Sequence, residues 1–190
     1  IRGVAGRDTQ GRQIAGGGIW YGTGNAKNMA FKLPENQPQS SKSAEITAAL
    51  LVTQQTDRDQ PLVLHSSSGT VYSEMTRQLQ SKEDKGWIGV PERDLLRVLA
   101  AELKARTATT RFEIDGTQSD KEGQRELSSL AREGRVAEEI LLNLGIDPLY
   151  ELKGAKLVKL TQALAYAGIK ERKEPPARKA ARSNTDTVGQ

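Results

Sequence analysis

The chain has 190 residues, which fits one domain of ordinary size with some chain to spare. It has no cysteine, so disulfides and thiolate metal sites are excluded, and with only 4% aromatic residues its core must consist mainly of Leu, Val, Ile and Ala. The net charge is +4, and most of the excess lies from residue 168 onward, where six Lys or Arg stand against three acids. No apolar run approaches the ~18 residues of a membrane span and the sequence opens with no signal-like segment, so we expect an intracellular protein without a membrane partner.

The first part of the chain predicts three strands and a helix. The ranges 1–6, 15–22 and 28–33 carry apolar or alternating patterns between short polar turns, which is typical of an antiparallel meander. A loop rich in Pro, Gln, Asn and Ser comes next, at 34–41. Residues 43–55 then show the apolar stripe of a helix.

The middle of the chain alternates between strands and helices. A buried strand is predicted at 61–64, followed by a polar turn that contains Ser66, Ser67 and Ser68. The elements expected after this turn are a helix at 69–80, a charged loop at 81–89, an amphipathic helix at 91–106, a strand at 110–114 and a helix at 123–133. A meander followed by such alternation predicts a mixed α/β sheet with helices packed on its faces.

The pattern changes after Gly134. Helices are predicted at 136–144 and at 155–167, and Gly168 is expected to end the second one. From residue 171 onward the composition predicts a disordered tail.

Five short motifs stand in an order and spacing that together point to one family. They are AGGGIWYG at 15–22, SAEITAAL at 43–50, PLVLHSSS at 61–68, DKGWIGV at 84–90 and GQRELSSLAREG at 123–134. This set resembles the ribonuclease H family, and most closely the fungal type found in retroelement-derived, reverse transcriptase-associated reading frames. The segment at 151–173 also resembles the region C-terminal to the nuclease domain in those reading frames.

The resemblance implies a fold and a domain organisation. The expected fold is a ribonuclease H-like α/β fold, with a mixed five-stranded sheet made of an antiparallel three-strand meander plus parallel strands, and helices on both faces. We expect this domain at 1–134, a C-terminal helical extension at 135–170 and a basic, disordered tail at 171–190.

The resemblance also implies a set of site positions. The family hydrolyses phosphodiesters with two Mg²⁺ ions held by four carboxylates, usually with a histidine on a loop. By local alignment, the family's first aspartate, helix glutamate, second aspartate, loop histidine and last aspartate fall, in that order, on Val4, Glu45, Ser67, Gln118 and Ser128. Only Glu45 keeps a carboxylate.

These replacements predict a catalytically inactive domain without a metal cofactor. A single Glu cannot hold two Mg²⁺ ions, because Mg²⁺ requires near-octahedral oxygen ligands and several anions. Gln118 cannot transfer a proton at ordinary pH. His65 is the only histidine of the chain, and we expect it to have a packing role instead of a catalytic one.

Several residues are candidates for contacting nucleic acid. Gln10 and Ser41 occupy positions where the family has asparagines that meet the minor groove of an RNA–DNA hybrid. Trp87, beside Lys85, either stacks on a sugar or base or fills the core. The remaining candidates are the cations near the C-terminus, Arg172, Lys173, Arg178, Lys179 and Arg182, which either bind polyanions or belong to a solvated linker.

The sequence supports three functional hypotheses. The first is an inactive ribonuclease H-like domain with a nucleic-acid-binding or scaffolding role, which binds hybrid or duplex weakly. The second is a protein-interaction module that docks a protein partner, or the rest of a larger polypeptide, on the vacated fold or on the helix at 155–167. The third is an active metal-dependent ribonuclease that cuts RNA in RNA–DNA hybrids.

Overall fold

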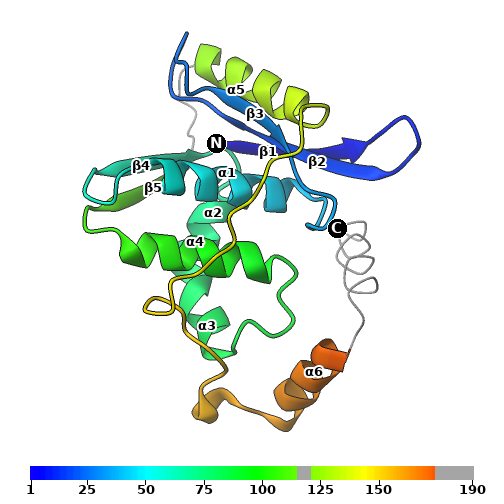
Figure 1. Ribbon diagram of the computed structural model, residues 1–190, viewed down its shortest axis with the longest axis vertical. Helices are drawn as coiled ribbons and strands as arrows, with labels where there is room; N and C mark the ends of the chain where they lie inside the picture. The colour runs from blue at the N-terminus through cyan, green and yellow to red at the C-terminus, as the bar shows by residue number, and fades with distance from the viewer. Residues whose placement is uncertain (115–120, 174–190) are drawn as a thin grey trace.

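Five strands form the centre of the molecule in a computed structural model that describes residues 1–114 and 121–173 (Figure 1). The strands are β1 (Arg2–Arg7), β2 (Gln13–Ile19), β3 (Met29–Lys32), β4 (Leu62–Ser66) and β5 (Thr110–Ile114). The predicted mixed α/β fold is confirmed, and β5 has the predicted bounds. The predicted strand at 15–22 lies earlier, because Tyr21 and Gly22 belong to the turn that Asn28 closes with its side chain.

The strands form two ladders that meet at the start of the chain. β1, β2 and β3 pair antiparallel in that order, and β4 pairs parallel with β5. Ile1 connects the ladders, because its nitrogen donates to the His65 carbonyl at 2.7 Å and its carbonyl accepts from Ser67 N at 3.3 Å. The resulting order is β3-β2-β1-β4-β5, the expected meander extended by parallel strands.

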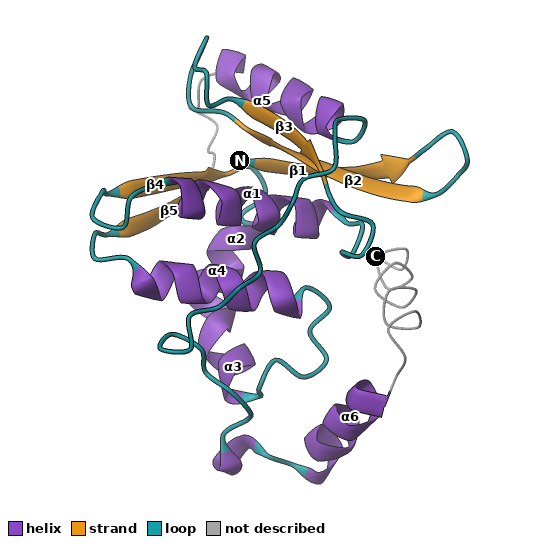
Figure 2. Cartoon of the chain, viewed as in Figure 1, coloured by secondary structure: helices purple, strands orange, loops and turns teal. Residues whose placement is uncertain are grey.

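Helices cover both faces of the sheet (Figure 2). The helical segments are α1 (Ser41–Gln55), α2 (Thr70–Tyr72), the π-helix η1 (Ser73–Gln78), α3 (Leu79–Asp84), α4 (Arg93–Ala105), α5 (Lys121–Gly134), the 3-10 turn η2 (Leu157–Lys159) and α6 (Gln162–Lys173). α5 lies on one face of the meander, whereas α1 lies on the other and packs against α4. No helix of the described residues is both long and apolar enough to span a membrane.

Burial on nearly all sides explains the composition of α1. The helix begins after Ser40, whose hydroxyl accepts from Ser43 N at 3.0 Å. Its Ala and aliphatic side chains are almost all inaccessible, because the sheet lies on one side and α4 on the other. α4 is amphipathic and buries Leu95, Leu96 and Leu99 from the predicted stripe.

Glycines allow α5 to lie directly on β2. A Cβ at Gly16 would stand 2.3 Å from the Gly134 carbonyl carbon, and a Cβ at Gly18 would stand 2.7 Å from Ala131 N. A Cβ at Gly134 would in turn meet the Gly17 carbonyl oxygen at 2.6 Å. Backbone therefore packs on backbone, which explains the glycine run in the AGGGIWYG motif.

The predicted charged loop at 81–89 is wrong in its first half. Helical structure continues through η1 and α3 to Asp84, with one wider π turn in between. Trp87 adopts a left-handed backbone with φ of 60° and is only 3% exposed. The buried indole therefore belongs to the core, one of the two alternatives that the sequence left open.

The predicted helix at 136–144 is also wrong. This segment is extended, and its backbone pairs with β3, because Lys32 N donates to the Glu138 carbonyl and Ile140 N donates to the Lys32 carbonyl, both at 3.2 Å. Alternate residues Ile140, Leu142, Leu144 and Ile146 pack against the core, as the two-residue period of an extended chain requires. A run of aliphatic residues does not distinguish these two periods, and pairing with the sheet edge decides between them.

The last predicted helix, at 155–167, corresponds to α6, which begins at Gln162 and ends at Lys173. Thr161 caps α6, because its hydroxyl accepts from Leu164 N at 3.1 Å and its carbonyl accepts from Ala165 N at 2.9 Å. Gly168 lies inside the helix instead of ending it. Lys170 and the two basic residues after it stabilise the final turn, where cations are favourable.

Candidate functional site

Glu45 lies at the centre of the site that the sequence predicts. It projects from the second turn of α1 and is only 2% exposed. Its Oε1 accepts a hydrogen bond from the Ser66 hydroxyl, and its Oε2 accepts one from the Ser68 hydroxyl at 2.6 Å. Both carboxylate oxygens are thus held by neutral donors.

The turn after β4 brings these serines to Glu45. β4 ends at Ser66, whose hydroxyl oxygen also accepts from Gly69 N at 2.9 Å. Gly69 has φ of 68°, a conformation that glycine adopts readily. Ser68 accepts from Thr70 N at 3.2 Å and lies 2.6 Å from the Thr70 hydroxyl. The serines therefore fix the start of the helical run and tie it to α1.

Ser67, the predicted successor of a metal-binding aspartate, makes a different contact. Its backbone nitrogen donates to Ile1, and no hydrogen bond joins its side chain to Glu45. Ser66 and Ser68 take the position beside the carboxylate instead. Ser66 ends β4 and Ser68 lies in the bend after it, so strand alternation could not have identified this pair from the sequence.

The other predicted positions lie on the α5 side of the sheet. Val4 pairs with Gly16, which faces α5, and Arg2 from the same strand face donates from Nη1 to the Ser128 hydroxyl at 3.0 Å. Ser128 donates to the Gln124 carbonyl at 2.6 Å. β1 and α5 thus bring Ser128 beside a guanidinium, whereas Gln118 lies outside the described residues.

The β1 residue that approaches Glu45 is Gly3. A Cβ at Gly3 would stand 2.6 Å from Glu45 N and 2.1 Å from the Ser41 carbonyl oxygen. This close approach leaves no room for a side chain at position 3.

These donors do not fit a pair of Mg²⁺ ions. Mg²⁺ prefers anionic and water oxygens in octahedral geometry. Glu45 supplies one carboxylate that is already engaged, Ser66 and Ser68 supply neutral hydroxyls, and Arg2 adds a positive charge at Ser128. Within residues 1–114 and 121–173, no group of three His, Cys, Asp or Glu side chains could hold a metal ion.

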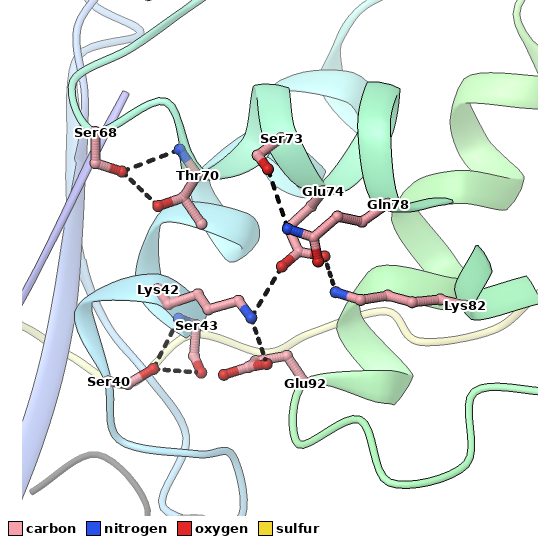
Figure 3. A network of polar contacts seen from close by, with 10 residues as sticks. All are labelled: Ser40, Lys42, Ser43, Ser68, Thr70, Ser73, Glu74, Gln78, Lys82 and Glu92. Carbon is pink, nitrogen blue, oxygen red and sulfur yellow. Dashed lines mark hydrogen bonds and ion pairs between the residues drawn. The ribbon is translucent and has the colours of Figure 1, made fainter. Parts of the chain in front are cut away.

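A network of charges lies next to this turn (Figure 3). Glu74 from η1 is 3% exposed and binds both Lys42, at 2.9 Å, and Lys82. Lys42 Nζ also lies 3.1 Å from Glu92 Oε2 and forms an ion pair with it. α1, the helical run after β4 and the start of α4 are therefore joined by charge.

The network shifts the pKa values of its members. Burial raises the pKa of Glu74, but hydrogen bonds from Lys82 and Lys42 and their positive charges outweigh it, and the pKa lies below its ordinary value of 4.5. Burial lowers the pKa of Lys42, but the charges and hydrogen bonds of Glu92 and Glu74 outweigh it, and the pKa lies above its ordinary value.

The nucleic-acid candidates do not form one surface. Gln10 is exposed in the turn between β1 and β2, and Ser41 uses its hydroxyl to accept from Ala5 N at 2.9 Å. Lys85 is exposed, and Trp87 is buried. The exposed Arg172 and Lys173 end α6, at a distance from the β1–β2 turn in Figure 1, and Arg178, Lys179 and Arg182 lie outside the described residues.

His65 does not form a nucleophilic site with the neighbouring serines. Its Nδ1 lies 3.7 Å from Glu113 Oε2, on the outer side of β4. The Ser66 hydroxyl is bound to Glu45, and successive strand residues point to opposite faces.

Comparison with known proteins supports the fold. No protein-family model matches the sequence, and no curated protein matches it. Among solved structures, the chain is similar to that of the foamy viral protease-reverse transcriptase in complex with dsDNA, with a TM-score of 0.55 and 15% sequence identity. The similarity covers 70% of this chain and 89% of that chain. At this identity it concerns the fold alone, and it agrees with the ribonuclease H-like architecture that the sequence motifs imply.

We expect Glu45→Gln to destabilise the protein. The amide loses one of the two oxygens that accept from serine hydroxyls and loses the charge that strengthens both bonds, at a cost of about 1–3 kcal/mol. Urea unfolding measures the difference. Glu113→Gln, which alters a half-exposed carboxylate, serves as the control and should change stability by less than about 0.5 kcal/mol. A stabilised Glu45→Gln protein would contradict a structural role for Glu45, because removing charge from a repulsive functional site usually increases stability.

We also expect Glu74→Gln to weaken the acid dependence of stability. Since the pKa of Glu74 is lowered in the folded protein, its contribution is complete above about pH 4.5 and disappears as the pH falls through the lower folded value. The variant should lose about 2 kcal/mol at pH 7 and show a smaller further loss in acid. Urea midpoints between pH 3 and pH 7 measure both effects, with the exposed Asp94→Asn as control. Parallel pH profiles for wild type and Glu74→Gln would exclude this contribution.

Proposed function

We propose that this chain is a ribonuclease H-like domain of a retroelement-derived polypeptide that does not hydrolyse RNA and that serves to bind nucleic acid. The observation that carries the proposal is the state of Glu45. The one carboxylate retained from the family's set is buried, and serine hydroxyls occupy both of its oxygens.

The chemistry around Glu45 supports the loss of activity. Two-metal hydrolysis requires a cluster of negative charge that holds the cations and stabilises the transition state. Here two neutral serines stand beside Glu45, and Arg2 binds Ser128 on the far side of β1. A site with these donors lacks the negative charge that is needed to hold a second cation.

Two observations favour a nucleic-acid ligand. The structure with a similar fold is that of a reverse transcriptase in complex with dsDNA. The end of α6 presents Lys170, Arg172 and Lys173, which are exposed and take part in no ion pair in the described part of the chain. Phosphate contacts of this kind give affinity without base specificity.

A second function is favoured by a different observation. Nine of the eleven exposed large hydrophobic side chains in the described residues lie between Val136 and Ile169. Apolar side chains gathered in one segment are typical of a protein-binding surface, so a protein-interaction role is the alternative. An active ribonuclease with unusual ligands is the minor alternative.

We expect no Glu45-dependent cleavage of an RNA–DNA hybrid. The purified chain is incubated with labelled hybrid in Mg²⁺ or Mn²⁺, beside an active ribonuclease H, at a temperature where Glu45→Gln remains folded by circular dichroism. Wild type and Glu45→Gln should give the same background. Cutting by wild type that disappears in Glu45→Gln would establish the active enzyme and refute the proposal.

We expect weak binding to hybrid and duplex that decreases with salt. Neutralising two phosphate contacts in Arg172→Gln/Lys173→Gln should lower the slope of log K against log salt by up to ~2. Fluorescence anisotropy between about 25 and about 200 mM salt measures the slope. Lys27→Gln/Arg111→Gln removes two exposed cations elsewhere and is the control. Absence of binding at the lowest salt would leave the protein-interaction role in place of the nucleic-acid role.

A further inference from the structure

The chain after α5 separates its charges into two halves. Residues 136–152, here called the acidic strap, contain four acids and no Lys or Arg, for a net charge of −4. Residues 153–173, here called the basic arm, contain six Lys or Arg and one acid, for a net charge of +5. Such segregation within 38 consecutive residues gives one chain two complementary surfaces.

The acidic strap exposes apolar side chains beside unpaired acids. Its backbone is fixed by the bonds to Lys32, and its alternate residues are turned into the core. The outward Leu141 is therefore forced into solvent and is 98% exposed, and Val136, in the turn after α5, is 84% exposed. Glu138 and Glu139 are exposed between them and form no ion pair in the described part of the chain.

The basic arm also exposes apolar side chains, in its case beside unpaired cations. Leu157 is 85% exposed and Val158 is 88% exposed, on the turn before α6. Lys159 and Lys170 are exposed and form no ion pair with the described residues. The one acid of the arm, Glu171, is bound by Arg93, so it does not offset the positive charge that faces outward.

Both halves are attached to the body of the molecule in ways that leave these surfaces outward. Arg97 of α4 binds Glu151, and Lys156 binds Asp84 of α3 at 2.7 Å. Figure 1 shows α6 at one end of the molecule, away from α5, where the strap begins. The arm of one molecule therefore does not cover its own strap.

We propose that the basic arm binds the acidic strap of a second copy of this chain. In a pair with twofold symmetry, each copy contributes one arm and one strap, so the contact is made twice. The pairing covers the exposed leucines and valines of both halves and brings Glu138 and Glu139 close to the lysines of the arm. It is independent of whether the Glu45 site hydrolyses RNA.

Charge and polarity favour this occupant over others. A contact between two arms would place cations against cations, and a contact between two straps would place acids against acids. Nucleic acid that binds the cations at the end of α6, as proposed above, leaves Leu157 and Val158 exposed and does not bind the acidic strap. With a second copy, the acids of each strap pair with the cations of an arm, and the exposed apolar side chains of the strap and the arm cover one another.

Analytical ultracentrifugation of the full 190-residue chain tests the proposal. We expect a reversible monomer–dimer equilibrium that weakens as salt increases, because the contact depends partly on charge. Reversing the strap in Glu138→Lys/Glu139→Lys, or the arm in Lys159→Glu/Lys170→Glu, should each raise the dimer Kd by ~10-fold or more. Asp57→Lys/Asp59→Lys makes the same charge change at an exposed site elsewhere and should leave the Kd unchanged.

Mixing the two reversed variants is the decisive step. The strap-reversed copy then has lysines in place of Glu138 and Glu139 and keeps its basic arm, and the arm-reversed copy has glutamates in place of Lys159 and Lys170 and keeps its acidic strap. Each arm again meets a strap of opposite charge, so a heterodimer should form with a Kd close to that of the wild type. Circular dichroism confirms that both variants are folded before they are mixed.

A site-specific cross-link gives a second measurement. Since the chain has no cysteine, Leu141→Cys and Val158→Cys each introduce a single thiol. Mild oxidation of an equimolar mixture should give the mixed disulfide in excess over either homodimer. Three results would overturn the proposal: a monomer at all concentrations up to about 100 μM, a dimer whose Kd neither reversal changes, or a mixture of the two reversed variants that does not associate.

Discussion

The hydrogen bonds from Ser66 and Ser68 to Glu45 join α1 to the turn that follows β4. α1 lies on one face of the sheet, and β4 ends at its edge beside Ile1, where the two ladders meet. A buried carboxylate must receive hydrogen bonds, or it is neutralised or expelled. Glu45 therefore fixes the turn after β4, and this turn sets the direction of the helical run that leads to α4.

A site for two cations imposes the opposite requirement. Several carboxylates that converge repel one another until metal ions bind, so such a site is less stable when it is empty. In this chain the hydroxyls of Ser66 and Ser68 lie beside Glu45, and several charged side chains form a network a few residues away. Lys42 lies in the same helix as Glu45 and is paired with Glu74 and Glu92, so these two buried acids share a compensating cation. Charge at this end of the sheet thus stabilises the contact between helices.

Much of the fold could be predicted because local pattern and tertiary environment agree. The stripe of α4 and the bounds of β5 agree with periodicity, and the glycines of β2 agree with the close approach of α5. The site was predictable as a location, the end of β4 next to Glu45, but not as a set of contacts. Alignment selected Ser67, whereas the end of β4 and the bend after it turn Ser66 and Ser68 toward Glu45. Trp87 could not be assigned from the sequence, because an indole between charged residues suits both an exposed ligand site and the core.

The extension after α5 shows why the remaining predictions failed and what the failure means. Its aliphatic residues are frequent enough to satisfy a helical period, but an edge strand offers hydrogen bonds to Lys32 and selects the extended form. An extended chain can bury only every second side chain against one body, so Leu141 is left outside when Ile140 and Leu142 are packed inward. The exposed apolar surface is therefore a direct consequence of the conformation, and a chain that retains it next to unpaired Glu138 and Glu139 has the composition of a contact surface and not that of a solvated linker.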